Sequence, residues 1–188
     1  VLIGEIRDSE TAESAVRAAQ TGHLGLSTLH TNDSISAITR LLDMRIDPFL
    51  LGSSLVCSIA QRLAQRICPH CKQPDPEFAA DLREEMASML GLPVHETQAF
   101  RGAGCIECHG KGHRGRVGIY ESFVMTEEIA DLLGPSIKTG QLRAAARATG
   151  WRTLREQGWA KVQAGYIAAS ELQRLTRRIK PSAPEAGA

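Results

Sequence analysis

The sequence is poor in aromatic residues and carries almost no net charge. Aromatic side chains make up 4% of the 188 residues, so a folded core must be built mainly from aliphatic side chains. The formal net charge is +1, which provides no overall attraction to nucleic acid or to an anionic membrane surface. No apolar run approaches the roughly 18 residues that a membrane-spanning helix needs. We therefore expect a globular protein that neither binds nucleic acid nor crosses a membrane.

An initiating methionine is also missing. The chain opens on Val1-Leu2-Ile3-Gly4, a short apolar segment typical of a strand that is buried on both faces. We therefore expect this sequence to be a piece of a longer protein whose remaining core precedes Val1. Such a piece would leave part of its apolar surface exposed.

Local patterns predict alternating strands and helices at the start of the chain. Strands are expected over residues 1–4 and 24–29, and a helix is expected after each of them. Asp8 or Ser9 can cap the first helix and Asp33 the second. This order favours an α/β layer with parallel strands.

The composition changes at Cys68, where prolines and then glycines become frequent. We expect a helix over residues 50–63 before this point, a helix over 78–90 and a strand over 117–123 after it, and helices from Thr126 onward. The last helix should start with a capping box formed by Ser170 and Gln173. The expected segments are 1–67, 68–116, 117–180 and a disordered tail over 181–188.

Four of the five cysteines form two C-x2-C pairs, Cys68 with Cys71 and Cys105 with Cys108. Two such pairs can complete the tetrahedral sulfur shell that Zn²⁺ prefers, with no open position for catalysis. Nearby glycines would let backbone N–H groups approach the sulfurs. The intervening residues exceed the roughly 15–20 of a usual zinc ribbon, so a helical insertion must separate the pairs. Cys57 lacks a partner at this spacing and is expected to be a buried small apolar residue.

The spacing of the cysteines is also compatible with another metal, a metal cluster or free thiols. Disulfides are disfavoured, because nothing in the sequence indicates secretion. Histidines near the pairs could replace a cysteine as ligand, although solvated loop histidines account for them more simply: His70, His109 and His113.

Polar residues end both expected strands near the start of the chain. Glu5 ends the first strand, and Thr28 and His30 end the second. Ligands of open α/β sheets bind at this edge, where a carboxylate can orient water or hydrated Mg²⁺ for attack on a phosphate. Taken alone the pattern is weak, because an apolar run followed by Glu is common and His30 could equally cap a helix or satisfy a loop carbonyl.

Several segments together resemble the ATPases of type II secretion and type IV pilus assembly. Residues 4–12 (GEIRDSETA) resemble the Walker B segment of that family, and residues 21–24 and 27–33 resemble its histidine box. The two C-x2-C pairs resemble the tetracysteine module of the secretion and assembly branch, which retraction ATPases generally lack. Further matching segments bring the resemblance to nearly all of residues 1–178: 38–41, 60–63, 115–121 and 150–154.

The resemblance implies an incomplete RecA-like P-loop NTPase core of α/β class, followed by a zinc module and a helical region. It implies two catalytic residues: Glu5, which polarises the attacking water or the metal-bound water, and His30. It also implies that His23 and His30 stand near the phosphates and couple nucleotide state to subunit contacts. It also implies a set of nucleotide-binding positions: Gly4, Arg7, Asp8, His23 and Thr28. The metal ligands implied are Cys68, Cys71, Cys105 and Cys108.

The resemblance further implies cofactors, partners and a location. The cofactors are ATP with Mg²⁺, and structural Zn²⁺. The partners are other copies of the chain in a hexameric ring and an inner-membrane platform protein. The location is cytoplasmic, at the periphery of the inner membrane.

The family's phosphate loop, G-x-x-x-x-G-K-[ST], is absent from this sequence. Because that loop supplies most of the grip on phosphate, we expect the chain alone to bind ATP weakly or not at all. An alternative function is a non-enzymatic zinc-bearing module that docks on the platform protein. Nucleic-acid binding by a zinc ribbon is disfavoured, because the net charge is small and the helix dipole accounts for the terminal cations: Arg174, Arg177, Arg178 and Lys180.

Overall fold

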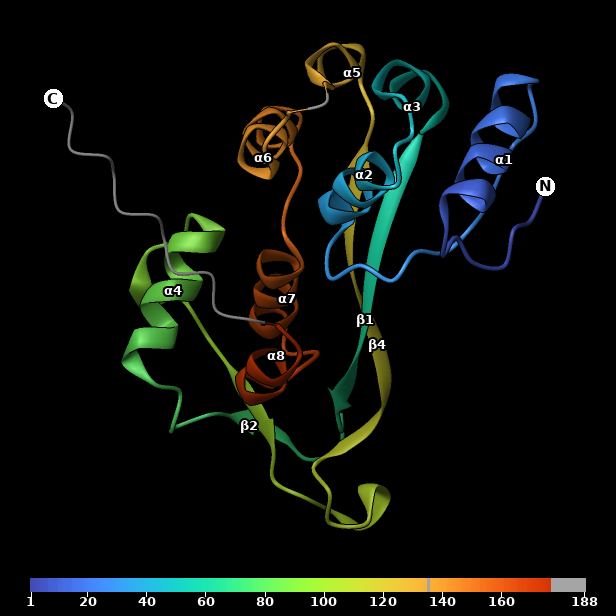
Figure 1. Cartoon of the computed structure of the whole chain (residues 1–188). Helices are drawn as coiled ribbons and strands as arrows, with labels where there is room; N and C mark the ends of the chain where they lie inside the picture. Colours follow the sequence, from blue (N-terminus) through green and yellow to red (C-terminus); the bar gives the residue numbers. More distant parts are fainter. Residues whose placement is uncertain (135, 177–188) are drawn as a thin grey trace, which may run out of the picture. The chain divides into compact units, whose positions relative to one another are not determined.

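The computed structural model of the chain describes residues 1–134 and 136–176 (Figure 1). The expected tail over 181–188 and the cations Arg177, Arg178 and Lys180 lie outside the described residues. The described part divides into two compact units, each built from two pieces of chain. Unit 1 comprises residues 1–61 and 120–153, and unit 2 comprises residues 62–119 and those from 154 onward. The segments expected from the sequence are each continuous, and their boundaries stay a prediction.

Unit 1 begins with two extended segments that run side by side in parallel. A parallel bridge joins Leu2 to Leu26, and the backbone N–H of Ile6 donates to the carbonyl of Thr28 at 2.9 Å. The expected parallel neighbours are therefore confirmed, although the pairing is too short to form full strands. The expected burial on both faces is wrong, because Ile6 is buried whereas Leu2 is 80% exposed.

Three helices follow in the first piece of unit 1: α1 (Ser9–Gln20), α2 (Ser34–Asp43) and α3 (Pro48–Ser54). Both expected caps are confirmed. Asp8 accepts a hydrogen bond from the Thr11 N–H at 2.8 Å, and Asp33 accepts one from the Ser36 N–H at 2.7 Å. Such caps satisfy backbone donors that the first helical turn leaves unpaired.

The helix expected over residues 50–63 is wrong beyond Ser54. Strand β1 (Cys57–Ile67) replaces its second half and pairs with β4 (His113–Val124). The buried alanines Ala60 and Ala64 recur at helical spacing, but a partner strand far along the sequence decides the structure. Cys57 was expected to be buried and is exposed.

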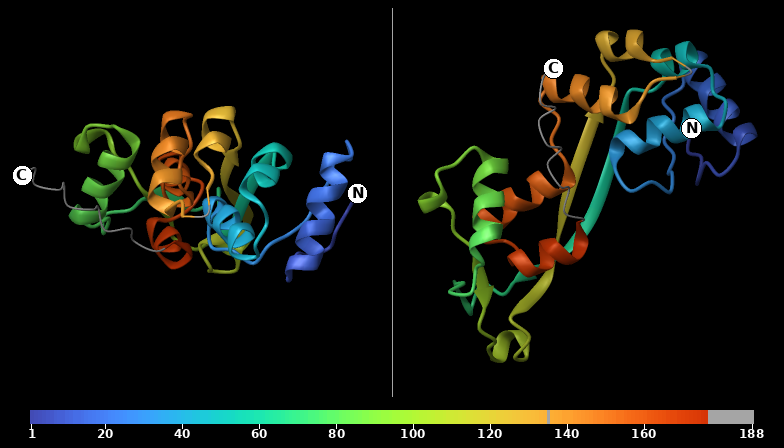
Figure 2. Two further views of the ribbon diagram at one scale, coloured as in Figure 1. Left: turned by 45° about the horizontal axis from the view of Figure 1, so that its top comes forward. Right: turned by 60° about the vertical axis from the view of Figure 1, so that its left-hand side comes forward.

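The second piece of unit 1 contains the end of β4 and the helices α5 (Glu127–Leu132) and α6 (Thr139–Ala148). The expected strand over 117–123 is confirmed. Helix α5 packs on α3, and α6 packs on α2 (Figure 2). The shared core is mainly aliphatic, as the scarcity of aromatic residues predicts. Its largest fully buried side chains come from both pieces: Ile35, Ile38, Leu51, Phe123, Ile129 and Leu142.

In its described residues, unit 2 combines a small antiparallel pair with three helices. Strand β2 (Lys72–Pro74) pairs with β3 (Phe100–Gly102), and α7 (Leu154–Gln163) packs on both α4 (Ala80–Leu90) and α8 (Ala169–Leu175) (Figure 1). The described residues of unit 2 also include the short turns η1 (Val94–Glu96) and η2 (Ile106–Cys108), the end of β1 from residue 62 and the start of β4 up to residue 119. Helix α4 confirms the helix expected over 78–90. The expected capping box at Ser170 is wrong, because α8 already begins at Ala169 and lacks a side-chain cap.

Within the described residues, no helix is both long enough and apolar enough to cross a membrane.

Candidate functional site

Glu5 lies at the end of the first extended segment of unit 1, with two basic side chains over it. The Arg7 Nε donates a hydrogen bond to Glu5 Oε2 at 2.6 Å, and His30 Nε2 lies 2.5 Å from Glu5 Oε1. The Glu5 side chain is 19% exposed, whereas those of Arg7 and His30 are 76% and 88% exposed. Two exposed basic side chains therefore separate a largely shielded carboxylate from solvent.

The neighbours of Glu5 favour its ionised form. The hydrogen bond from Arg7 is the largest cause that lowers the pKa of Glu5 below its usual value, while burial opposes it. The charges of Arg7 and His30 lower that pKa further. Glu5 is therefore a carboxylate at neutral pH, able to accept hydrogen bonds from water or from metal-bound water.

Thr28 joins the two extended segments beside Glu5. Its hydroxyl donates to the carbonyl of Gly4 at 2.8 Å, so this side chain holds the register of the pair. A Cβ built on Gly4 would have no atom within 4 Å, which leaves open space over the backbone just before Glu5.

Two other expected site residues make their contacts with helix α1. Asp8 caps its first turn, and the backbone hydrogen bond from Thr11 lowers the pKa of Asp8. His23 follows the end of α1, where its Nδ1 lies 3.0 Å from the Thr21 hydroxyl. The structure thus brings Glu5 and His30 together with Arg7, whereas Asp8 and His23 are placed at the ends of α1.

The four paired cysteines of unit 2 come together in one cluster. Their Sγ atoms all lie within 4.8 Å of one another, with separations of 3.8 Å for Cys68–Cys105, 3.9 Å for Cys71–Cys108 and 3.7 Å for Cys105–Cys108. A tetrahedron with metal–sulfur bonds of about 2.3 Å has edges of about 3.8 Å. These separations are far longer than a disulfide bond of about 2.05 Å. The donor set therefore fits a tetrahedral metal ion.

Backbone N–H groups point at these sulfurs, as the neighbouring glycines predict. Cys71 Sγ accepts from Gly104 at 3.3 Å, and Cys108 Sγ accepts from Cys105 and Gly112 at 3.2 Å each. Burial raises the pKa of Cys71 to about 11. Burial also raises the pKa of Cys108. Hydrogen bonds from the backbone N–H groups of Cys105 and Gly112 and from the Cys105 and Cys71 side chains outweigh this effect and lower the pKa to about 6. Among the described residues, the cluster consists of these cysteines without His70, His109 or His113.

Both sites lie within a segment that matches a known protein family. The family model described as "Type II/IV secretion system protein" matches residues 1–174, which include the Glu5 site and the cysteine cluster. The chain belongs to this family.

Curated relatives of the secretion family agree with this assignment. The chain is 44% identical to type II secretion system protein HxcR of Pseudomonas aeruginosa, covering 94% of this chain and 33% of the relative. It is 40% identical to type II secretion system ATPase E of Vibrio cholerae, covering 94% of this chain and 34% of the relative. It is 40% identical to type IV pilus assembly ATPase PilB of Thermus thermophilus, covering 96% of this chain and 20% of the relative. The chain thus spans about a third or less of the length of these relatives.

Solved structures confirm the α/β fold of P-loop ATPases. The ATPase DotB of Legionella pneumophila superposes with a TM-score of 0.61 at 19% identity, covering 93% of this chain and 37% of DotB. The pilus retraction motor PilT with bound ADP superposes with a TM-score of 0.60 at 23% identity, covering 94% of this chain and 39% of PilT.

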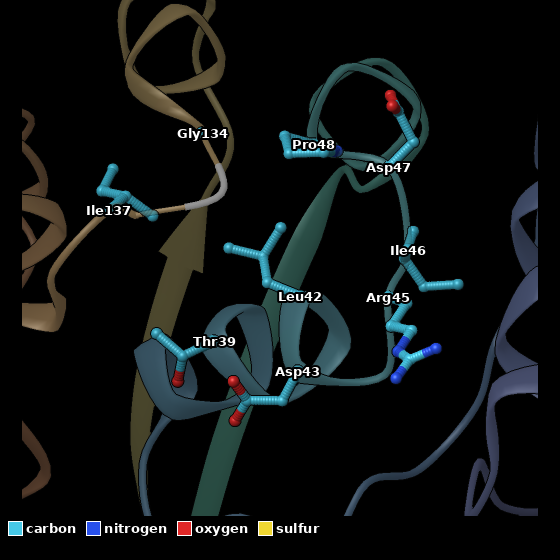
Figure 3. Close-up of a pocket in the computed structure, with 9 residues that line it drawn as sticks. All are labelled: Thr39, Leu42, Asp43, Arg45, Ile46, Asp47, Pro48, Gly134 and Ile137. Carbon is cyan, nitrogen blue, oxygen red and sulfur yellow. The ribbon is translucent and has the colours of Figure 1, made fainter.

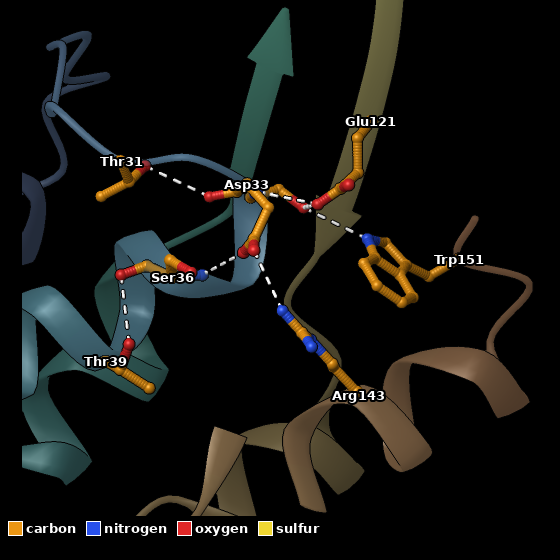
Figure 4. A network of polar contacts seen from close by, with 8 residues as sticks. Thr31, Asp33, Ser36, Thr39, Glu121, Arg143 and Trp151 are labelled. Carbon is orange, nitrogen blue, oxygen red and sulfur yellow. Dashed lines mark hydrogen bonds and ion pairs between the residues drawn. The ribbon is translucent and has the colours of Figure 1, made fainter. Parts of the chain in front are cut away.

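Sequence reasoning missed a buried polar network beside the His30 loop of this secretion-family chain. Glu121 on β4 is 2% exposed and accepts hydrogen bonds from Ser34, which also contacts Trp151 (Figure 4). A signal was present, because Glu121 lies between Ile119 and Phe123 at the period of a strand face, and both neighbours are buried. A carboxyl group on a core-facing position needs a hydrogen-bonding partner.

A pocket of about 420 Å³ also lies in unit 1 of this chain, between α2, α3 and the segment after α5 (Figure 3). Arg45, Asp43 and Asp47 provide its charged groups. Its described lining residues include none of the site residues expected from the sequence.

Proposed function

We propose that this chain is the C-terminal portion of a ring-forming ATPase that powers type II protein secretion or type IV pilus assembly. The observation that carries the proposal is the Glu5 carboxylate at the end of a parallel pair, with His30 Nε2 at 2.5 Å. Membership of the secretion family and relatives named as secretion and pilus ATPases support it. The family also includes proteins of both systems, so the proposal covers either one.

In the proposed site, Glu5 orients the water that attacks the terminal phosphate of ATP. A Mg²⁺ ion, when bound with ATP, neutralises charge on the phosphate oxygens. His30 and Arg7 hold Glu5 in place and offer N–H groups to the phosphates, and Gly4 leaves room for the nucleotide. Thr28 fixes the strand register that sets this geometry, and we assign Asp8 and His23 to the surrounding nucleotide-binding shell.

The proposal has a direct consequence for the isolated chain. The sequence contains no G-x-x-x-x-G-K-[ST] loop, so strong phosphate binding must come from residues outside it. The test is a titration of the chain, and of its Glu5→Gln variant, with a fluorescent ATP analogue in the presence of Mg²⁺. We expect neither protein to show saturable binding of the analogue up to millimolar concentration. Saturable binding that depends on Glu5 would instead show that these residues hold phosphate by themselves.

Catalysis is tested by supplying the rest of the motor from a relative. This chain can replace the matching 177 residues of type II secretion system ATPase E of Vibrio cholerae. We expect this chimera to hydrolyse ATP, with Glu5→Gln lowering kcat by about 100-fold or more, as for loss of a group that positions the nucleophile. Glu13→Gln, on an exposed α1 position, is the matched control and should leave kcat unchanged. A folded, assembled chimera whose kcat is indifferent to Glu5→Gln refutes the catalytic assignment.

We also assign a structural Zn²⁺ to Cys68, Cys71, Cys105 and Cys108. The sulfur separations and the N–H donors to sulfur support this assignment, because a closed four-thiolate shell is typical of structural zinc. The proposed partners are ATP, further copies of the chain in a hexameric ring, and an inner-membrane platform protein. The proposed location is the cytoplasmic face of the inner membrane.

A second candidate function is a zinc-bearing docking module that hydrolyses nothing. The exposed tip of unit 2 favours it, because Ile106 in η2 lies between two cluster cysteines and is 91% exposed. An apolar side chain on a rigid turn is suited to insertion into a partner. We expect Ile106→Asp to reduce binding to the platform protein at least tenfold while metal content stays unchanged. Unaltered binding of this variant would remove the docking role from the tip.

A further inference from the structure

The loop that carries His30 is fixed at its upstream end by the parallel pair. The Thr28 carbonyl accepts from the Ile6 N–H at 2.9 Å, and the Thr28 hydroxyl donates to Gly4 at 2.8 Å. His30 follows two residues later, with its ring over Glu5 and its side chain 88% exposed. Packing alone therefore does not hold this ring, and its position depends on the backbone of the loop.

The downstream end of the loop is fixed by a carboxyl group from a distant strand. The Ser34 backbone N–H donates to Glu121 Oε1 at 2.8 Å, and the Ser34 hydroxyl donates to the same oxygen at 2.5 Å (Figure 4). Trp151 Nε1 donates to the Ser34 hydroxyl oxygen at 3.1 Å. Because an indole N–H is only a donor, the single hydrogen of the hydroxyl remains available to Glu121. Trp151, Ser34 and Glu121 thus form one directed chain of hydrogen bonds.

Glu121 does more than cap helix α2. Asp33 already caps this helix through the Ser36 N–H at 2.7 Å. Glu121, which lies 87 positions downstream of Ser34, adds a second carboxyl group at the start of α2. The positive end of the helix dipole at this point offsets the cost of burying that carboxyl group. Because Asp33 already caps α2, we take the additional bond to Glu121 to fix the position of the start of α2 relative to β4.

A second contact from the same piece of unit 1 acts on the loop. Arg143 on α6 donates to Asp33 Oδ2 at 3.0 Å, and the Thr31 hydroxyl donates to the Asp33 carbonyl at 3.2 Å (Figure 4). Residues from β4, α6 and the segment after α6 therefore converge on Asp33 and Ser34, at the start of α2.

We propose that Glu121 is a positioning residue that, through Ser34, holds the His30 loop within reach of Glu5. This inference rests on the proposed function, in which His30 acts beside Glu5 on ATP. Because Glu121 contacts Ser34 at the start of α2, its effect on ATP hydrolysis depends on the position of the His30 loop.

The first test needs no nucleotide and uses the chain alone. We expect Glu121→Ala to speed amide hydrogen exchange at Ser34 and across residues 29–34 by about tenfold or more, since a hydrogen bond to a buried carboxyl group is lost. Glu121→Gln keeps an acceptor oxygen and should give a smaller change, which guards against a variant that fails to fold. The matched control is Glu171→Ala, which removes a buried carboxyl group that accepts the Gln65 N–H in unit 2 and should leave residues 29–34 unchanged. Unchanged exchange at residues 29–34 in Glu121→Ala overturns the inference.

The second test is a double-mutant cycle in the Vibrio cholerae chimera. We expect Glu121→Ala to lower kcat by about 10-fold to 100-fold with a smaller change in KM, as for misplacement of a positioned group. In the His30→Ala background the same substitution should have no further effect on kcat, because its effect passes through His30. An equal loss in both backgrounds would assign Glu121 a general structural role and overturn the inference.

The two tests separate failure of this inference from failure of the proposed function. If the parent chimera hydrolyses ATP but His30→Ala leaves kcat unchanged, the role proposed for His30 is wrong. The exchange experiment then still decides whether Glu121 positions the loop.

Discussion

Glu5 shows how two neighbouring side chains set the state of one carboxyl group. Arg7 donates to it and His30 lies over it, and both lower the pKa of Glu5 while burial opposes them. Because the folded-state pKa is lowered, ionised Glu5 contributes stability above its usual pKa, and this contribution is lost as the pH falls through the lowered value. The same neighbours keep the carboxylate ready to accept a hydrogen bond at neutral pH.

Removing Arg7 should therefore move this titration. We expect Arg7→Gln to raise the pKa of Glu5 toward the usual glutamate value, measured by carboxyl-carbon NMR over an acid titration. Arg17→Gln is the matched control, because Arg17 is an exposed arginine whose partner is Glu13 rather than Glu5. An identical pKa of Glu5 in wild type and Arg7→Gln would exclude Arg7 as the cause of the shift.

Among the elements, the pair β2–β3 requires glycine at a position that no local sequence pattern reveals. Gly102 on β3 pairs with Lys72 on β2, and its Cα faces the backbone of Gly112. A Cβ at Gly102 would lie 1.9 Å from the Gly112 carbonyl oxygen. That carbonyl accepts from the Cys68 N–H at 3.0 Å, and the Gly112 N–H donates to Cys108 Sγ. The close approach of two glycine backbones thus shapes the cysteine cluster.

We expect Gly102→Ala to destabilise unit 2 by about 2 kcal/mol or more, because backbone atoms must move to admit the methyl group. Urea unfolding measures the change, and a lower affinity for metal should accompany it. Gly140→Ala on α6 is the control, since a Cβ there meets no atom within 4 Å and alanine is the better helix former. Equal stability of Gly102→Ala and wild type would show that the two backbones can separate at little cost.

Features that depend on residues close together in the sequence were predictable, and those that depend on distant residues were not. Asp8 and Asp33 were predictable as caps because capping depends on residues three positions apart. The C-x2-C pairs likewise predicted the cluster by their spacing. The prediction of helix in place of β1 was wrong because its buried alanines recur every four residues and its partner β4 is remote. The contact of Glu121 with Ser34 was missed for the same reason, because the two residues lie 87 positions apart in the sequence.

For the molecule as a whole, the assignment of Zn²⁺ to the four cysteines predicts how many zinc ions each chain binds. We expect one Zn²⁺ per chain by native mass spectrometry, lost in Cys71→Ser and retained in Cys57→Ser, because Cys57 is exposed and lies outside the cluster. Chelation should lower the melting temperature of unit 2, since metal binding in such modules contributes directly to folding. Full occupancy in Cys71→Ser would exclude the four-thiolate site.

The division of unit 1 into two pieces has a consequence for how the protein is made. Residues 1–61 contribute Ile35, Ile38 and Leu51 to the core, but Phe123 and Trp151 of the same core are translated much later. Contacts that span so much chain close slowly, because the intervening residues cost loop entropy before any contact forms. The contacts of Ser34 with Glu121 and Trp151 likewise join residues that are translated far apart. Until Phe123 and Trp151 are translated, Ile35, Ile38 and Leu51 lack these later core partners, so the packing of unit 1 depends on residues that follow most of unit 2 in the chain.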